Sequence, residues 1–383
     1  MRGGRLLLIL ALLALCGGVA AGPASAASHP AKHHKRPAKR RKPKAPRKHH
    51  RATPAVPGVR AVPVTFTVVN DNDTQVSCLP NNPDGKTYTV SGSLILPAGA
   101  TPAGVTLYAH GLGYASFFWD FSAVPGYDYS GAEAAAGHAS VVIDRLGYGK
   151  SSIPPGAATC VGSQATILHE IIQDLRAGRY TASGLTTPPS FSKVGLAGHS
   201  AGGQLVEVEA YTFKDIDALG VIEWADQFYS LGAYTAFGGD AVQCVEGNVK
   251  QVGSSSTGYA QFGTTDAQFD SLMLHDVAPA VEAAVNALRT NDPCGQIESI
   301  LTGTLIDIAN VGSIKIPIAY VHAGADAIFQ AGLPWPSFQK SLYTGTPKLT
   351  DISLPGEGHA VTLERRAPQL EAAMSAWLSA NGL

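Results

Sequence analysis

Ser200 stands at the centre of the pentapeptide Gly198-His199-Ser200-Ala201-Gly202. The apolar run KVGLA precedes this pentapeptide and an apolar segment with helical spacing follows it, so Ser200 falls at a turn from a strand into a helix. Small neighbours leave room for a strained backbone, and the helix N-terminus behind the serine favours developing negative charge. These features predict that Ser200 is a nucleophile rather than a serine in an ordinary glycine-rich turn.

A serine hydroxyl needs a general base, and that base needs an acid to orient it. His359 lies in LPGEGHAV, after a predicted strand and before the last predicted helix, where a loop can return an imidazole to the serine. Two aspartates are candidates for the acid because each follows a strand: Asp326 in YVHAGADAIF and Asp226 in IEWAD. We favour Asp326, since the loop after the penultimate strand is the commoner source of this acid.

Strand and helix patterns that could position these residues alternate from residue 61 onward. The β-branched segments 62–70 and 86–97 predict an antiparallel opening pair. Apolar strand patterns then begin at residues 104, 139, 193, 218, 315 and 348, with helical patterns at 126–138, 164–178, 200–213 and 363–382 between or after them. This alternation predicts an α/β fold with a mostly parallel central sheet and helices on both faces.

The alternation stops between about residues 225 and 312. This stretch is rich in Gly, Ser, Thr and Ala and contains helical pieces such as APAVEAAVNALRT. Because strand patterns resume after it, we expect a cap inserted between two late strands of one domain that spans residues 61–383.

Several segments now show a resemblance to the α/β-hydrolase family, over residues 62–383 apart from the cap. The order Ser200, Asp326, His359 is the order of nucleophile, acid and histidine in that family. HAGADAIF resembles its acid loop, with Ala323 in place of the usual glycine, and PGEGHAV resembles its histidine loop. The resemblance therefore implies a Ser-His-Asp triad on an α/β-hydrolase fold.

Two further segments resemble parts of the same family. AHGLG resembles its oxyanion loop, which implies that the N–H groups of Leu112 and Ala201 bind the oxyanion while His110 supports the loop. DRLGYGKSS resembles a segment that is more often structural than catalytic, so Asp144 and Arg145 are not expected in the site.

The resemblance implies a serine hydrolase that cleaves carboxylic esters through an acyl-enzyme. A peptidase, a thioesterase, a lactonase or a non-catalytic envelope-anchored binding protein on the same scaffold are the alternatives. The stretch GYASFFWDF provides an apolar substrate pocket or ordinary core, through Tyr114, Phe117, Phe118 and Trp119. Neither a glycine-rich phosphate loop nor a Cys/His metal cluster appears in the sequence, so no cofactor and no metal are expected.

The composition of the first 60 residues differs from that of the rest of the chain. Residues 1–26 have the charged, apolar and small-residue regions of a secretory signal peptide, which leaves no transmembrane segment in the mature protein. A lipoprotein site at Cys16 is disfavoured by the bulky Leu15 before it. Residues 27–60 form a basic linker rich in Pro, His, Lys and Arg, which cannot bury apolar surface. Its most basic part, residues 28–51, is either a solvated spacer or a tether to an anionic cell-surface polymer.

Charge is distributed unevenly along the chain. Of the 28 Lys and Arg, 13 precede Ala52, whereas all 29 Asp and Glu follow Asn70. The remaining domain thus has a formal charge of −14, which argues against nucleic acid as a specific partner.

Four cysteines remain once the signal peptide, with Cys16, is removed. An even number in an exported protein predicts two disulfides with three possible pairings. We favour Cys78–Cys160 and Cys244–Cys294, because each pair then stays within one structural region.

Overall fold

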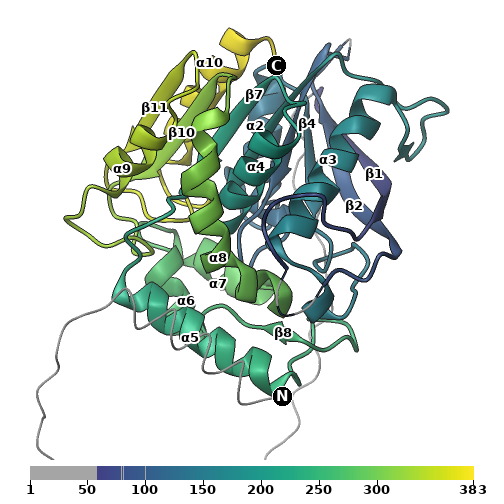
Figure 1. Cartoon of the computed structure of the whole chain (residues 1–383). Coiled ribbons are helices and arrows are strands. Elements are labelled where there is room, and N and C mark those ends of the chain that lie inside the picture. The colour runs from purple at the N-terminus through teal and green to yellow at the C-terminus, as the bar shows by residue number, and fades with distance from the viewer. Residues whose placement is uncertain (1–57, 79, 81, 100) are drawn as a thin grey trace, which may run out of the picture.

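A nine-stranded sheet runs through the part of the chain that the computed structural model describes, residues 58–383 without 79, 81 and 100 (Figure 1). Its order is β11-β10-β7-β6-β3-β4-β2-β1-β5. The strands are β1 (Arg60–Val69), β2 (Thr87–Leu96), β3 (Gly104–Ala109), β4 (Ser140–Asp144), β5 (Thr181–Ala182), β6 (Lys193–His199), β7 (Ala218–Ile222), β10 (Ile318–Ala323) and β11 (Leu349–Leu354). The predicted signal peptide and most of the basic linker, including residues 28–51, lie outside the described residues.

The direction of the strands follows their burial patterns. From β4 through β3, β6, β7 and β10 to β11 all neighbours are parallel, and β3, β4 and β7 are buried at every position. A parallel strand covered by helices on both faces requires such continuous apolar sequence. In β1 buried and exposed positions alternate instead, and β1 pairs antiparallel with β2. The predicted antiparallel opening pair and mostly parallel sheet are therefore confirmed.

Helices cover both faces of the sheet. On one face α3 and α4 pack against each other, and on the other α2 packs with α10. Outside the insertion the helices are η1 (Ser116–Phe118), α2 (Tyr129–Ala135), η2 (Gly156–Ala158), α3 (Val161–Ala177), α4 (Ala201–Thr212), α9 (Trp335–Leu342) and α10 (Ala367–Asn381). The short helix α9 and the two-residue strand β5 were not predicted from the sequence.

Residues 225–312, called the insert below, contain most of the chain between β7 and β10. Their elements are α5 (Leu231–Glu246), β8 (Tyr259–Ala260), α6 (Asp266–Met273), α7 (Pro279–Leu288), β9 (Asp292–Pro293) and α8 (Cys294–Asn310), followed by η3 (Val311–Ser313). Figure 1 shows α5, α6 and α7 together below the sheet, whereas α8 packs against α4. Strands β8 and β9 form a separate two-stranded sheet.

Two disulfides connect segments that are distant in the sequence. Cys78–Cys160 ties the segment after β1 to the N-terminus of α3, and Cys244–Cys294 ties the end of α5 to the start of α8. Both predicted pairings are confirmed. The second disulfide closes the insert upon itself.

Candidate active site

Ser200 joins the end of β6 to the start of α4 in a strained backbone conformation. Its φ of 54° and ψ of −128° lie in a region that a residue with a side chain seldom adopts. A Cβ at Gly198 would lie 2.1 Å from the carbonyl oxygen of Gly202, and one at Gly202 would lie 2.5 Å from that of Ala109. The turn therefore has no room for side chains at either flank, and Ser200 itself stays partly exposed.

His359 and Asp326 form a fully buried pair. Asp326 follows β10, His359 follows β11, and the Oδ2 atom of Asp326 lies 2.7 Å from Nδ1 of His359. The second carboxylate oxygen of Asp326 accepts the backbone N–H of Ile328, which fixes the acid loop. The other ring nitrogen of His359, Nε2, is buried without a hydrogen-bond partner in the described structure. It is therefore available to a hydroxyl proton.

His199, the residue before Ser200, connects the serine turn to the histidine loop. Its Nε2 atom lies 2.8 Å from the carbonyl oxygen of His359, and the two imidazole rings are 4.8 Å apart. Phe118 stacks on the other side of His199 at 4.0 Å. Burial, followed by the neighbouring His359, lowers the pKa of His199 well below its ordinary value. A neutral His199 can donate from Nε2 to that carbonyl and so hold the loop of His359.

The predicted oxyanion loop lies against Ser200. A Cβ added to Gly111 would come within 2.8 Å of the Cβ of Ser200, so the two backbones are in close contact. Leu112 follows Gly111 and is buried, and Ala201 is the first residue of α4. Of the two residues predicted to bind an oxyanion, Ala201 directly follows Ser200, and Leu112 directly follows Gly111, which contacts Ser200.

Residues from other segments fix this loop. Arg145 donates from Nη2 to the carbonyl oxygen of Gly111 at 3.2 Å. Asp292, in β9 of the insert, accepts the backbone N–H of Gly113 at 2.9 Å and also the hydroxyl of Tyr148. The prediction that Arg145 supports structure agrees with this contact. Asp292 had no signal in the sequence, because its partner lies 179 positions away.

Asp226, the other candidate for the acid, has different partners. Its carboxylate accepts hydrogen bonds from Nε1 of Trp224 and Nε2 of Gln339, at 3.1 and 3.0 Å. It belongs to a buried group of carboxylates with Glu207 and Asp307. Burial raises the pKa of Asp226 to about 7. The geometry therefore pairs His359 with Asp326.

Glu223 was not predicted and lies beside the Asp326–His359 pair. It directly follows β7, and it has an unusual positive φ of 50° for a residue with a side chain. Its carboxylate, the carboxylate of Asp326 and the ring of His359 come within 4.8 Å of one another. Burial, and then the charge of Asp326, raise the pKa of Glu223 well above its ordinary value. Burial beside the carboxylate of Asp326 therefore favours the protonated form of Glu223.

The four aromatic residues predicted for a substrate pocket are unequally accessible. Tyr114, Phe118 and Trp119 are fully buried, whereas Phe117 is partly exposed. Trp119 packs on Tyr108, and Tyr114 packs on Phe269 of the insert. Three of the four therefore contribute to the core, and only Phe117 of these four is partly exposed to solvent.

A cavity of about 520 Å³ lies between the insert and the loops after β7 and β10. Its walls are mostly apolar or aromatic and include Tyr229, Tyr234, Leu301, Leu305, Ile308 and Leu333. Tyr229 stacks on Phe329, whose ring lies 6.5 Å from that of His359. The cavity is thus separated from the histidine by two aromatic rings.

Three groups of His, Asp and Glu in the described chain have potential ligand atoms within 4.8 Å of one another. One contains His359 and Asp326, whose direct contact already satisfies Nδ1 of the imidazole. The second is the carboxylate group around Asp226. The third, His169 with Glu209 and Asp215, lies apart from Ser200. In residues 58–383, so far as they are described, every helix is too short or too polar to cross a bilayer.

A mostly parallel sheet with helices on both faces and a strained serine at a strand-to-helix turn defines the α/β-hydrolase class of fold. Residues 107–373 match the model of the alpha/beta hydrolase family, and the chain belongs to that family. No curated protein matches the chain in sequence.

Solved structures with the same fold include three lipolytic enzymes. A carboxyl esterase from Bacillus coagulans has a TM-score of 0.56 at 14% identity, covering 83% of this chain and 99% of that chain. A monoacylglycerol lipase from Paleococcus ferrophilus has a TM-score of 0.54 at 19% identity, covering 77% and 99%. An esterase from Thermogutta terrifontis has a TM-score of 0.52 at 16% identity, covering 83% and 100%. At these identities the likeness concerns the fold.

Proposed function

We propose that this protein is a secreted serine hydrolase that cleaves carboxylic esters through an acyl-enzyme. The observation that carries the proposal is the buried 2.7 Å contact between Asp326 and His359, next to the strained turn of Ser200. Strain at a serine flanked by two glycines has no structural benefit of its own, and it presents the hydroxyl at the carboxyl edge of the sheet.

In the proposed reaction, Ser200 Oγ attacks the ester carbonyl and Nε2 of His359 takes its proton. Asp326 holds the Nδ1–H of His359 and stabilises the imidazolium. The N–H groups of Leu112 and Ala201 stabilise the tetrahedral oxyanion. His359 then protonates the departing alcohol, and a water molecule, deprotonated by the same imidazole, releases the acid and restores Ser200.

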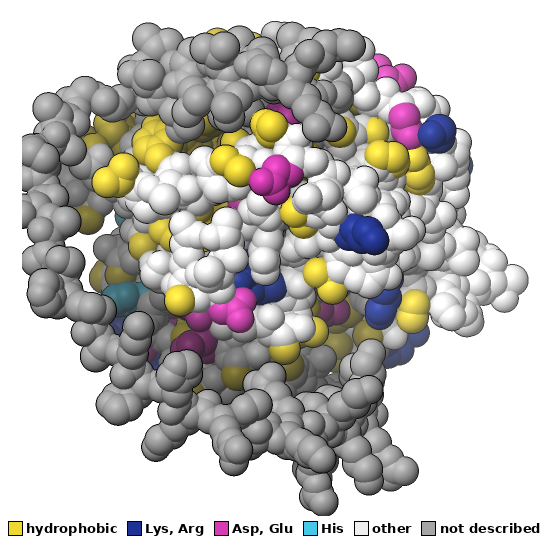
Figure 2. Space-filling view, turned by 90° about the horizontal axis from the view of Figure 1, so that it is seen from below, with side chains coloured by type: hydrophobic (Ala, Val, Ile, Leu, Met, Phe, Trp, Pro, Cys, Tyr) yellow, Lys and Arg dark blue, Asp and Glu magenta, His cyan; other side chains and the backbone are white. Residues whose placement is uncertain are grey.

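Apolar acyl groups are the substrates that the surroundings favour. The 520 Å³ cavity lined by Tyr229, Leu301 and Leu305 adjoins the rings packed beside His359. Large exposed apolar side chains also concentrate on the insert, where Leu231 is 83% exposed and Val252 and Leu305 are each 62% exposed. Figure 2 shows hydrophobic side chains scattered over the lower face of the molecule between few charged ones. The structurally similar monoacylglycerol lipase and carboxyl esterase support the same class of substrate.

The proposed location is outside the cytoplasm. Two disulfides support an oxidising compartment, and the N-terminal 26 residues have the pattern of a signal peptide. The basic residues 28–51 are proposed to bind an anionic cell-surface polymer. Deleting them should abolish retention of the protein at the envelope and leave ester hydrolysis unaffected.

The test is hydrolysis of p-nitrophenyl esters of graded chain length by the mature protein and by Ser200→Ala. Loss of at least about 10⁴-fold in kcat in the variant is expected. Unchanged activity in the variant would exclude Ser200 as nucleophile. If no ester is hydrolysed, fluorophosphonate labelling of Ser200 would indicate a thioester, lactone or peptide substrate, and absence of labelling would favour a binding protein.

A further inference from the structure

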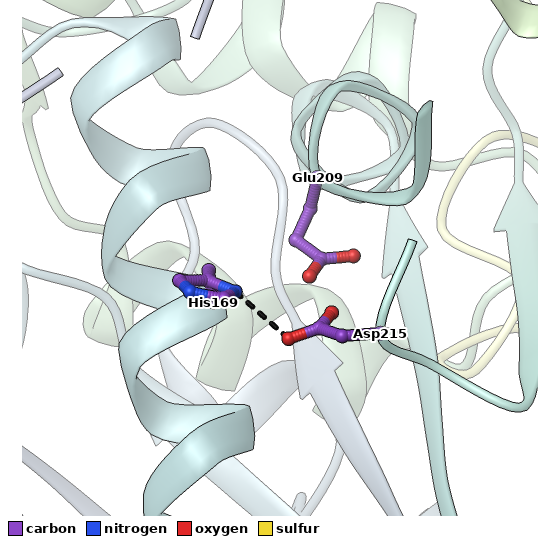
Figure 3. Close-up of side chains that lie close together, drawn as sticks. All are labelled: His169, Glu209 and Asp215. Carbon is purple, nitrogen blue, oxygen red and sulfur yellow. Dashed lines mark ion pairs between the residues drawn. The ribbon is translucent and has the colours of Figure 1, made fainter. Parts of the chain in front are cut away.

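The third cluster of potential ligands joins two helices and a loop on the α3–α4 face of the sheet. His169 lies on α3, Glu209 on α4, and Asp215 in the loop from α4 to β7 (Figure 3). Nδ1 of His169 lies 2.8 Å from Oδ2 of Asp215, and one oxygen of Glu209 completes a group within 4.8 Å. The three side chains point toward a common centre in Figure 3.

Glu209 is the residue that needs an explanation. Its side chain is fully buried, and neither of its carboxylate oxygens accepts a hydrogen bond. Burying a carboxylate that accepts no hydrogen bond is costly, so Glu209 must either hold a proton, which it can donate to the neighbouring Asp215, or face a cation. Oδ1 of Asp215 is also buried without a partner, which provides a second open oxygen toward the same centre.

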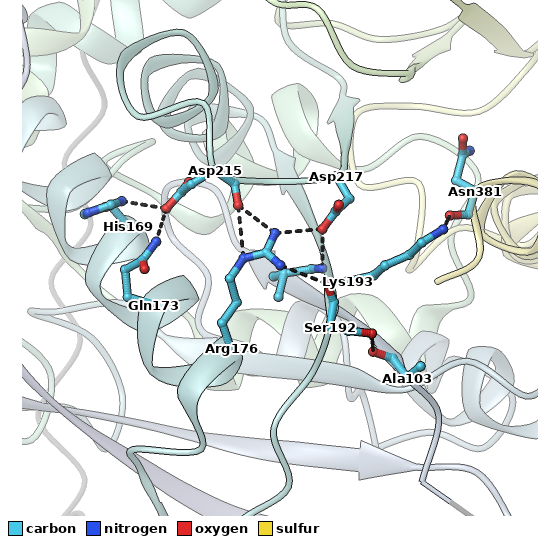
Figure 4. Close-up of polar contacts among 10 residues, drawn as sticks. Ala103, His169, Gln173, Arg176, Ser192, Lys193, Asp215, Asp217 and Asn381 are labelled. Carbon is cyan, nitrogen blue, oxygen red and sulfur yellow. Dashed lines mark hydrogen bonds and ion pairs between the residues drawn. The ribbon is translucent and has the colours of Figure 1, made fainter.

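The cations nearby have other partners. Arg176 donates from Nε and Nη2 to the backbone carbonyl of Asp215, and Nη2 also lies 2.7 Å from Oδ2 of Asp217 (Figure 4). Gln173, which is neutral, donates to the carboxylate of Asp215. Among the described residues, the guanidinium of Arg176 thus bonds to the carboxylate of Asp217 and to backbone carbonyls, and not to the carboxylates of Glu209 and Asp215. Two carboxylates are left facing a single imidazole.

One imidazole nitrogen and two carboxylate oxygens form a ligand set that suits Zn²⁺. Ca²⁺ and Mg²⁺ prefer oxygen ligands alone. Tetrahedral Zn²⁺ with bonds of about 2.0–2.1 Å holds its ligand atoms about 3.3 Å apart. The 2.8 Å pair would therefore open by about half an ångström while Glu209 approaches. The ring of His169 stacks on Phe213 at 4.0 Å, which fixes its plane.

Access from solvent is also present. The side chain of His169 is 28% exposed and that of Asp215 is 18% exposed, so an ion can enter and a water molecule can supply the fourth ligand. We propose that His169, Glu209 and Asp215 bind one Zn²⁺ ion that clamps α3 to α4 and to the loop before β7. The sequence could not indicate this site, because the ligands lie in three separate segments without a metal-binding spacing.

The site is separate from the proposed active site. Asp215 precedes β7, and Asp217 is bonded to Val194 at the start of β6, whereas Ser200 follows the end of β6. The seven residues of β6 span about 20 Å. Zinc here would stabilise the fold and leave the rate of ester hydrolysis unchanged.

The experiment compares the full mature chain with Glu209→Gln, both treated with EDTA and then titrated with ZnCl₂. The histidines of the basic linker can also take up zinc, so the total number of bound ions alone does not test the site. The wild type is expected to bind one more ion than the variant, and its Tm to rise by several degrees on zinc addition while that of the variant stays constant. Co²⁺ should add a tetrahedral absorption band in the wild type that is missing from the spectrum of the variant.

Glu209→Gln keeps the size and hydrogen-bonding capacity of a protonated glutamic acid, so it should fold if no metal is needed. Should it fail to fold, His169→Ala is titrated in its place. Equal stoichiometry and an equal Tm response in wild type and variant would overturn the proposal. Glu209 would then hold a proton shared with Asp215.

Discussion

Asp326 and His359 are in contact through Oδ2 and Nδ1 at 2.7 Å, and neither side chain is accessible to solvent. The two residues come from loops after neighbouring strands, β10 and β11, which pair in parallel. A buried contact of this kind fixes the orientation of the imidazole and leaves Nε2 as the ring nitrogen without a partner in the described structure. The choice between Asp326 and Asp226 is therefore open to a direct comparison of matched variants.

We expect Asp326→Asn to lower kcat by about 10⁴-fold, because the amide cannot stabilise the imidazolium and favours the wrong tautomer. Asp226→Asn is the matched control, since Asp226 is equally buried but bonded to Trp224 and Gln339. Its kcat should stay within a few-fold of the wild type. Steady-state kinetics on one ester decide the matter, and a reversed order of the two variants would assign the acid to Asp226.

Gly111→Ala should reduce kcat by about 10² to 10³-fold, the loss that follows removal of one oxyanion donor. The added methyl group would lie 2.8 Å from Cβ of Ser200, so the loop carrying Leu112 must move. Gly238→Ala in α5 is the control, because no atom lies within 4 Å of its new methyl group. Circular dichroism should show both variants folded. A fully active Gly111→Ala would mean that the loop does not bind the oxyanion.

The two disulfides should differ in their effect on catalysis. Removing either pair is expected to lower the free energy of unfolding by about 2–5 kcal/mol. Cys244→Ser with Cys294→Ser should in addition lower kcat, because Asp292, which holds the N–H of Gly113, is two residues from Cys294. Cys78→Ser with Cys160→Ser should preserve the kcat of the molecules that remain folded. Active-site titration alongside thermal unfolding separates the two effects, and equal kcat values would refute the coupling.

Stability should fall as pH rises, owing to buried carboxyl groups. Burial raises the pKa of Glu133 to about 8, well above its unfolded value near 4.3. Between those values the folded state binds more protons than the unfolded state. The contribution of Glu133 is therefore complete below about pH 4 and declines by about 1.4 kcal/mol per pH unit until about pH 8.

Glu133→Gln tests this linkage. The free energy of unfolding of the variant, measured with urea, should increase relative to that of the wild type at each step from pH 5 to pH 8. Glu282→Gln, at an exposed position of α7, should show a constant difference from wild type across the same range. A constant difference for Glu133→Gln as well would show that this carboxyl is ionised in the folded protein.

Local patterns predicted the parts of this protein that depend on neighbouring residues. The glycines around Ser200 indicated a crowded turn because both act within two residues of it, and the mostly parallel direction of the strands followed from continuous apolar runs. The proximity of His359 and Asp326 could be predicted because each lies in the loop after a strand, and β10 and β11 are neighbours in the sheet.

Contacts between distant segments could not be predicted in the same way. The sequence around Glu223 does not show that Asp326, which follows β10, lies beside it in the fold. Nor does the sequence show that Asp292 of the insert contacts Gly113. Phe118 and Trp119 looked equally suited to a pocket or a core, and only the packing of His199 and Tyr108 around them shows that they are buried.

The hydrogen bond from Gly113 to Asp292 also bears on how such enzymes could be recombined. Insertions of this kind are attractive modules for exchange, because replacing them leaves the strands of the sheet unchanged. Here the donor loop belongs to the sheet and its acceptor belongs to the insert. A chimera in which the replacement for residues 225–312 has no carboxylate to accept the N–H of Gly113 would thus lose turnover, and its substrate preference could not be measured. The loop and the insert should therefore be transplanted as one unit.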